Sequence, residues 1–265
     1  MLQSIDWSRP WYESVRGAAG KLTTDVHFRD AFSAQAAALG LRNHLGMPLT
    51  FVPQEALPDG TAYEAFIGAT GGVPTRDNLH DFFNGLVWLS FPLIKVRLNA
   101  LQAAQIAQDG VGKSRGPARD GATIFDENAA LLVVRDCDSG HRLTEALREH
   151  RWHDAFVGLR ASFGPDAQVW LFGHALMEKL VAPRKAITAH TRVVMAGDDF
   201  FAMEHEARRA WLDRQVAGDL EENGLSTADF TPMQALGVPG WWPDQDDAFY
   251  ADATVFRPKR PVAVK

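Results

Sequence analysis

The sequence lacks the features that define several protein classes. It contains one cysteine, Cys137, so an intramolecular disulfide and a zinc site built from several thiolates are both excluded. Lysine and arginine number 27 against 33 aspartates and glutamates, and this net charge of −6 argues against a generally basic nucleic-acid binder. The most apolar stretch, Phe82 to Ile94, falls short of the roughly 20 residues that cross a bilayer. Neither a nucleic-acid partner nor a membrane partner is therefore predicted.

Other absences bear on localisation and domain organisation. The first residues, MLQSIDWSRPWYES, have neither the basic start nor the apolar run of a signal peptide, so we expect a cytoplasmic protein. The sequence has no internal repeat and no low-complexity linker, and 46% hydrophobic residues are typical of a globular chain. We expect a single compact domain over 1–265, with an N-terminal helical arm (1–45), a core (46–235) and an irregular Pro- and Trp-rich tail (236–265).

Hydrophobic periodicity predicts an α+β fold that is predominantly helical with a small sheet. Helices are expected over residues 8–39, from 76 to just before Pro92, and over 93–107, 143–150, 153–163, 165–181 and 200–222. Strands are expected over 49–52, 62–69, 129–135 and 187–195. Thr75 is a predicted N-cap, Asn223-Gly224 a predicted C-cap, and residues 109–121 a predicted loop because four glycines and a proline occur there.

Charge is distributed unevenly along the chain. Residues 198–229 hold nine acidic and three basic side chains, a local balance of −6 that accounts for the whole net charge. Residues 92–120 hold five basic and two acidic side chains, a balance of +3. A small anionic molecule would be attracted to this second segment, although a solvated charged surface is the more common meaning of such a pattern.

One segment imitates a nucleotide-binding motif. Residues 107–114, AQDGVGKS, fit a relaxed phosphate-loop pattern with alanine in place of the first glycine. That motif needs a strand before the loop and a helix after it, whereas LNALQAAQIA precedes the loop here and is a strong helix former. Neither ATP nor NAD is therefore predicted as a cofactor.

Polar residues recur at helical spacing in the apolar stretch that begins near residue 79. His80, Asp81 and Asn84 fall on one face of the predicted helix, and large apolar residues occupy the opposite face. These types of side chain suit metal binding or substrate binding. The alternative is an ordinary first helical turn in which acidic residues complement the helix dipole.

A second polar pair, His174 and Glu178, lies four residues apart in the apolar segment WLFGHALMEKLV. An ionisable pair buried among apolar residues is costly unless it is satisfied internally. Histidine and glutamate at this spacing can share a metal ion or form one buried hydrogen-bonded pair. Both interpretations stay open at this point.

A third group, Asp126-Glu127-Asn128, immediately precedes the apolar run AALLVV. Carboxylates placed at the edge of a buried strand lie where pockets commonly form. Turn chemistry alone explains Asp126 and Asn128 better than it explains Glu127.

In four blocks the chain resembles the bacterial domain of unknown function 3025 family. They are LHDFFNGLVWLSFPLIKVRLNALQ (79–102), RGPARDGATIFDENAALLVV (115–134), FGHALMEKLVAPRKAITAH (172–190) and LGVPGWWPDQ (236–245). The resemblance implies an uncharacterised bacterial protein without an assigned reaction. It also implies a pattern centred on His80, Asp81, Asn84, Asn99, Asp126, Glu127, His174, Glu178 and Lys179, and this chain has those residues.

The leading hypothesis is a metal-assisted hydrolase acting on an anionic substrate, or an enzyme of oxygen chemistry if the metal is iron. The predicted ligands of zinc, manganese or iron are His80, Asp81, His174 and Glu178. Glu127 or Asp126 is the predicted general base. The predicted substrate-binding residues are Asn84, Lys95, Arg119 and Lys179.

The alternative hypothesis is a non-catalytic binding or scaffold protein. Its buried histidine and carboxylate side chains would then form a structural hydrogen-bond network. The acidic helix over 200–222 and the exposed-looking pair Trp241-Trp242 would be candidate surfaces for a protein partner.

Overall fold

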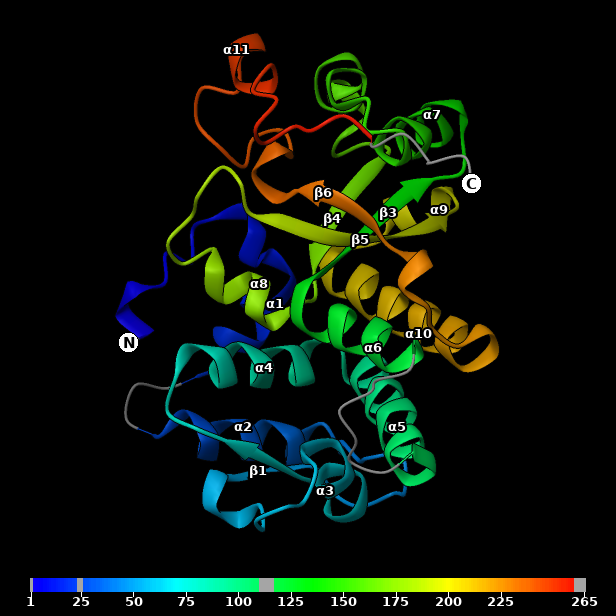
Figure 1. Cartoon of the computed structure of the whole chain (residues 1–265). Coiled ribbons are helices and arrows are strands. Elements are labelled where there is room, and N and C mark those ends of the chain that lie inside the picture. Colours follow the sequence, from blue (N-terminus) through cyan, green and yellow to red (C-terminus); the bar gives the residue numbers. More distant parts are fainter. Residues whose placement is uncertain (1, 23–25, 110–116, 260–265) are drawn as a thin grey trace.

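Two sheets lie on opposite sides of a layer of helices (Figure 1). The computed structural model describes residues 2–22, 26–109 and 117–259. The larger sheet has four strands in the order β4-β3-β5-β6, and the smaller has two parallel strands, β1 and β2. The fold is α+β and predominantly helical, as the sequence predicts.

The central strand of the larger sheet is β3, Ala129–Arg135, which pairs with β5 in parallel and with β4 antiparallel. Its first six residues are all buried, which explains why the sequence AALLVV is apolar without alternation. The strands of the two sheets are β1 Thr50–Pro53, β2 Gly72–Thr75, β4 Ala167–Leu171, β5 Thr188–Ala196 and β6 Thr231–Gln234. The predicted strands at 49–52, 129–135 and 187–195 are confirmed.

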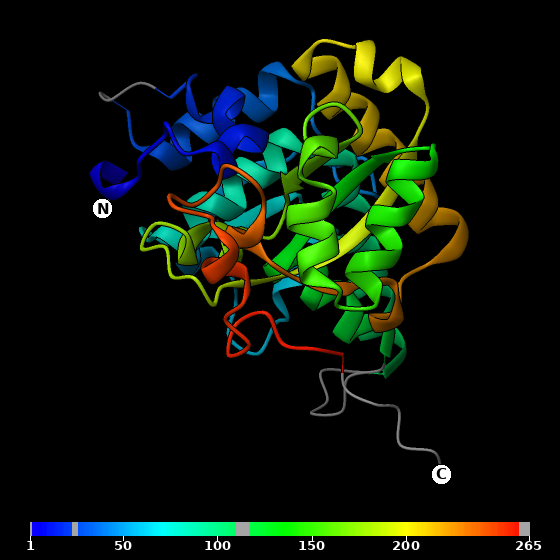
Figure 2. The ribbon, with the colours of Figure 1, turned by 90° about the horizontal axis from the view of Figure 1, so that it is seen from above.

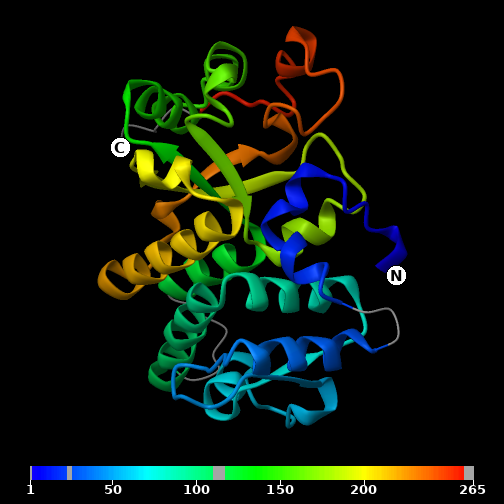
Figure 3. The same ribbon diagram turned by 180° about the vertical axis from the view of Figure 1, so that it is seen from behind.

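The described helices range from one turn to five turns in length. They are α1 Glu13–Ala19, α2 Phe28–Ala38, α3 Tyr63–Thr70, α4 Leu79–Ser90, α5 Pro92–Asp109, α6 Pro117–Asn128, α7 Asp138–Arg148, α8 His174–Lys179, α9 Asp198–Ala202, α10 His205–Asn223 and α11 Asp247–Tyr250. Seen from above, α7 and the short helical turns over 154–162 lie across the four-stranded sheet (Figure 2). Seen from behind, α1 lies beside α8, where the Tyr12 hydroxyl donates to the Met177 carbonyl (Figure 3).

The boundary between α4 and α5 follows from Pro92. Proline has no amide proton and fits the first position of a helix, so α4 ends at Ser90 and α5 begins at Pro92, as predicted. The carboxylate of Asp213 on α10 accepts hydrogen bonds from the amides of Leu93 and Ile94, at 3.1 and 3.0 Å. It thereby satisfies two of the amides that the start of α5 leaves unpaired.

The predicted strand at 62–69 is wrong, since this segment forms the helix α3. Its aromatic and β-branched residues suggested a strand, but Ile67 packs into the core and Gly71 ends the helix with a φ of +76°. The strand comes afterwards, because Gly72–Thr75 pairs with β1 and is fully buried. Thr75 therefore ends β2 and is not the cap of α4; Asn78 is, accepting from the Asp81 amide at 2.7 Å.

Other predicted boundaries also need correction, and one is the helix over 200–222, which is divided at Met203 and Glu204 into α9 and α10. Residues 165–181 do not form one helix, because β4 precedes α8 and its apolar residues are covered within the sheet. The predicted loop over 109–121 contains the start of α6, and residues 110–116, which hold most of the phosphate-loop-like segment, lie outside the described residues. The predicted helix over 8–39 is interrupted between Ala19 and Phe28.

The tail is folded back onto the N-terminal segment. Trp241 is only 9% exposed, and its ring lies 6.2 Å from that of Trp11. Trp241 is therefore not available as the exposed partner surface that the sequence suggested. Within the described residues, no helix combines the length and the apolar character that a membrane span requires.

Candidate metal site

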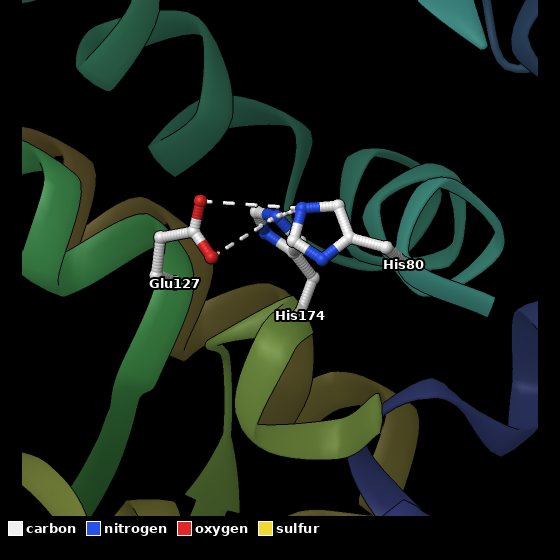
Figure 4. A group of neighbouring side chains, drawn as sticks. All are labelled: His80, Glu127 and His174. Atoms are coloured by element: carbon white, nitrogen blue, oxygen red, sulfur yellow. Dashed lines mark hydrogen bonds and ion pairs between the residues drawn. The ribbon is translucent and has the colours of Figure 1, made fainter. Parts of the chain in front are cut away.

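Three side chains from the ends of three helices meet at one point (Figure 4). His80 lies in the first turn of α4, Glu127 in the last turn of α6, and His174 is the first residue of α8. One ligand atom from each lies within 4.8 Å of the other two. The structure thus brings together His80 and His174, two of the predicted ligands, and Glu127, a predicted general base, and this group could hold a metal ion.

The distances within the group are short. The Nε2 atoms of His80 and His174 lie 3.0 Å apart. Glu127 faces both rings, with its carboxylate oxygens 4.0 Å from Nε2 of His80 and 3.8 Å from Nε2 of His174. Two imidazole nitrogens and one carboxylate therefore point at a common centre.

The ring of His80 is oriented by Glu178. Its Nδ1 lies 3.0 Å from Oε2 of Glu178, which is an acceptor, so the ring proton belongs on Nδ1. Nε2 is then left with a lone pair directed at His174. A carboxylate on the outer nitrogen of a histidine is the usual arrangement around protein metal sites, where it fixes the ring and its tautomer.

The ring of His174 is buried and uncharged. It is 4% exposed, and burial lowers its pKa to about 4, although the charge of Asp126 opposes this shift. Its Nδ1 lies 3.9 Å from Oδ1 of Asp126 and has no hydrogen-bond partner among the described residues. A proton on Nε2 is donated to Nε2 of His80, whereas a proton on Nδ1, toward which the negative charge of Asp126 acts, leaves a second lone pair on Nε2. Two lone pairs 3.0 Å apart repel each other unless a cation or a proton lies between them.

A buried polar network supports the site from behind. The Lys95 ammonium, 4% exposed, donates to Asp126 Oδ1 at 2.5 Å and to Asn84 Oδ1 at 2.9 Å. The Asn84 amide in turn donates to the Tyr63 hydroxyl at 3.0 Å. Burial opposes ionisation of Asp126, but the Lys95 ammonium holds its pKa below the ordinary value. Lys95 and Asn84, which the sequence suggested as substrate-binding residues, are thus engaged with neighbouring side chains.

The remaining predicted site residues lie around this centre or away from it. Asp81 is turned away, because its carboxylate is bound by the Arg76 guanidinium at 2.9 Å and by the Arg76 amide. Lys179 donates to Asn128 at 2.7 Å near the surface. The side chain of Arg119 lies outside the described part of the chain. The structure therefore does not bring Asp81 into the predicted ligand set.

A cavity of about 300 Å³ adjoins the group on the Glu127 side. Tyr63 and Glu64 of α3, Gln102 of α5, and Asp126 and Glu127 of α6 line it. Burial raises the pKa of Glu64, a shift that Lys95 partly offsets. The sequence reasoning did not identify Tyr63, Glu64 or Gln102. Interpreting residues 62–69 as a helix would have placed the first two on its opening turn.

Comparison with known proteins places the chain in a family. The family model described as Protein of unknown function (DUF3025) matches residues 49–260, which include every residue of the three-residue group. The chain belongs to this family. No curated protein and no solved structure matches it.

Close backbone packing at Gly173 sets the position of His174. A Cβ atom at Gly173 would lie 2.5 Å from the Ala129 amide nitrogen and 2.6 Å from that of Asn128. Gly173→Ala is therefore expected to lower the free energy of unfolding by about 1–3 kcal/mol, as overpacking does, and to weaken metal binding by displacing α8. Urea unfolding and a zinc titration measure the two effects.

Gly218→Ala is the matched control for this change. Gly218 lies within α10, and a Cβ there would meet nothing within 4 Å. Alanine at this helical position is expected to stabilise the protein by about 0.5–1 kcal/mol. Equal effects of the two substitutions would contradict the close packing assigned to Gly173.

Glu178→Gln tests the orientation of His80. Glutamine keeps an acceptor for the Nδ1 proton but removes the negative charge, so zinc affinity is expected to fall by about 10–100-fold while the protein stays folded. Glu145, whose side chain is 69% exposed on α7, supplies the control Glu145→Gln. If Glu178→Gln left the zinc affinity unchanged, Glu178 would have no role in orienting His80 for metal binding.

The neutral state of His174 predicts a pH dependence of stability in the metal-free protein. Its folded pKa of about 4 lies below the ordinary 6.5, so between these values the unfolded chain binds more protons than the folded one. Stability is thus expected to fall by up to about 3 kcal/mol as the pH drops from 6.5 to 4.

His174→Gln should remove this part of the pH dependence, measured by urea unfolding at several pH values. Burial raises the pKa of Asp213 to about 6, which acts in the opposite direction, but that contribution is common to both proteins. The difference between them isolates His174. Parallel pH profiles would contradict a buried, neutral imidazole at this position.

Proposed function

We propose that the protein is a metal-dependent hydrolase in which His80, His174 and Glu127 bind one divalent cation, with zinc as the best fit. One observation carries the proposal. The two Nε2 atoms lie 3.0 Å apart, while Nδ1 of His80 faces Glu178 and Nδ1 of His174 faces Asp126. With both Nδ1 atoms protonated, this arrangement directs two lone pairs at one point, where a cation would replace the proton that the two Nε2 atoms otherwise share.

The spacing of the donor atoms supports zinc. Zinc–nitrogen bonds of about 2.0–2.1 Å at tetrahedral angles place two nitrogens about 3.4 Å apart. The observed 3.0 Å between the nitrogens, and 3.8 and 4.0 Å to the Glu127 oxygens, differ from that spacing by about half an ångström. Small side-chain rotations bring all three donors to bonding distance. A bound zinc ion with an open position supplies an activated water molecule for hydrolysis.

This ligand set exchanges two roles expected from the sequence. Glu127, expected as a general base, becomes the carboxylate ligand, because it faces the Nε2 atoms of both rings. Glu178, expected as a ligand, becomes the residue that orients His80. Asp126 orients His174 and is itself paired with Lys95.

The anionic substrate expected from the sequence receives less support. Lys95 is engaged with Asp126 and Asn84, and the cavity beside Glu127 is lined by carboxylates. The basic segment over 92–120 therefore does not present Lys95 to a ligand.

The hydrolase proposal is tested by assaying zinc-loaded and chelator-treated protein against chromogenic carboxylic esters, phosphoesters and anilides. We expect zinc-dependent hydrolysis of at least one class, abolished by His174→Ala. Activity independent of zinc, or no turnover of any class by protein carrying stoichiometric zinc, would overturn the hydrolase proposal.

Two histidines and one carboxylate are also the ligand set of non-haem iron oxygenases, which makes oxygen chemistry the second candidate function. Oxygen consumption by iron(II)-loaded protein, with none of the zinc-dependent hydrolysis, would favour that candidate.

A further inference from the structure

The cavity between α3, α5 and α6 is acidic. Glu64, Asp126 and Glu127 line it, and none of the lining residues in the described part of the chain is basic. The nearby ammonium of Lys95 is held by Asp126 and Asn84. Once Glu127 binds a metal ion, Glu64 remains as the lining carboxylate with no ion pair among the described residues.

A nearly buried amide faces the same cavity without a partner. Gln102 of α5 is 9% exposed, lines the cavity and has no hydrogen bond to any described residue. Because this amide makes no hydrogen bond within the described residues, its polar atoms are available to a polar group that enters the cavity. The amide offers both an acceptor oxygen and donor hydrogens.

The hydroxyl group of Tyr63, on the same wall, can still donate a hydrogen bond to a ligand. The Tyr63 oxygen accepts a hydrogen bond from Asn84 at 3.0 Å, and its own proton has no acceptor among the described residues. The Glu64 carboxylate accepts one hydrogen bond, from the Asn99 side chain at 2.5 Å, through Oε2. Its second oxygen remains for a ligand. The wall thus combines one unpaired carboxylate oxygen, one free amide and one hydroxyl.

We propose that this cavity binds a primary ammonium group, with Glu64 as its counter-ion and Gln102 as a second hydrogen-bonding partner. An ammonium has three donors and one positive charge, which match the acceptors and the sign of the wall. The volume of about 300 Å³ suits a small aliphatic amine. Because the cavity adjoins Glu127, the substrate of the proposed hydrolase is an ester or amide that carries a free amino group. That last step rests on the proposed function, whereas the binding of an amine does not.

The test uses n-butylamine as the probe, with butyrate and n-butanol of the same chain length as comparisons, on the full chain after metal removal. Binding is followed at about pH 7 by chemical-shift changes in the protein. We expect saturable binding of butylamine, and no saturable binding of butyrate or butanol. Glu64→Gln should weaken butylamine on the order of tenfold, as expected for the loss of a charge-assisted hydrogen bond.

Two further variants define the outcome. Gln102→Leu is expected to weaken butylamine binding as well, whereas Glu55→Gln, at an exposed position in the turn after β1, should leave it unchanged. Butylamine binding that is absent, or equally strong in Glu64→Gln, overturns this inference even if zinc and hydrolysis are confirmed. Butylamine binding that depends on Glu64 in a protein without zinc affinity supports the cavity and refutes only the metal-based function.

Discussion

Replacing His174 with alanine is expected to lower zinc affinity by more than about 100-fold, because a ligand contributes more than the outer-shell partners, whose loss costs about 10–100-fold. His80→Ala should have an effect of the same order, since the two Nε2 atoms face one centre at 3.0 Å. Competition of each purified variant with a chromogenic zinc chelator measures the loss. His141→Ala is the control, because the side chain of His141 is 61% exposed on α7.

The same variants separate the metal site from a purely structural network. A metal site predicts that zinc raises the melting temperature of the parent protein and no longer does so in His174→Gln, because only the folded state binds the ion. A structural network predicts that His174→Gln destabilises the metal-free protein and that zinc has no effect on either. The second pattern would contradict a metal-binding role for His174.

Asp126→Leu is expected to lower the free energy of unfolding by about 3–5 kcal/mol, because it leaves the buried Lys95 ammonium without its counter-ion. Lys95 retains a hydrogen bond to Asn84 and a contact 5.1 Å above the Trp88 ring, but neither carries a full negative charge. Urea unfolding of the metal-free protein is the appropriate measurement, since it excludes any effect through zinc.

The double variant Lys95→Met/Asp126→Leu should recover most of that loss. Replacing both members of a buried ion pair with apolar residues is often close to neutral, whereas removing one member is not. Glu221→Gln supplies the exposed comparison, because it breaks the surface pair with Arg97 at a cost of less than about 1 kcal/mol. A double variant as unstable as Asp126→Leu would show that the network contributes something other than charge compensation.

Elements with one dominant local signal could be predicted from the sequence. The run AALLVV is apolar throughout because this part of β3 is buried, and Pro92 separates α4 from α5 because it lacks an amide proton. Residues 62–75 could not be assigned this way, because Ala62–Ala69 is rich in residues that suit either structure. The strand is formed by Gly72–Thr75 because this segment pairs with β1, which is distant in the sequence.

The members of the candidate site were more predictable than their arrangement. Helical spacing of four residues places His174 and Glu178 on one face of α8, and in the structure both contact His80. It could not show that they approach opposite nitrogens of that ring, so that only one of them faces the centre. Glu127 takes the other position because α6 continues directly into β3, where Gly173 packs against the junction. Such contacts depend on tertiary packing and have no local sequence signal.

The cavity residues were missed for the same reason. Tyr63 and Glu64 reach the site because α3 packs on α5, the helix that carries Gln102. When residues 62–69 are assigned to a strand, the sequence pattern gives no reason to place Tyr63 and Glu64 near Gln102.

The central claim is that His80, His174 and Glu127 bind one metal ion. Anomalous X-ray diffraction from a crystal of the untagged, zinc-loaded protein, recorded on both sides of the zinc absorption edge, tests it most directly. The account predicts one peak per chain, at about 2.0–2.2 Å from Nε2 of His80, Nε2 of His174 and a carboxylate oxygen of Glu127. A crystal without a peak at this position, or with zinc bound only elsewhere, would contradict it.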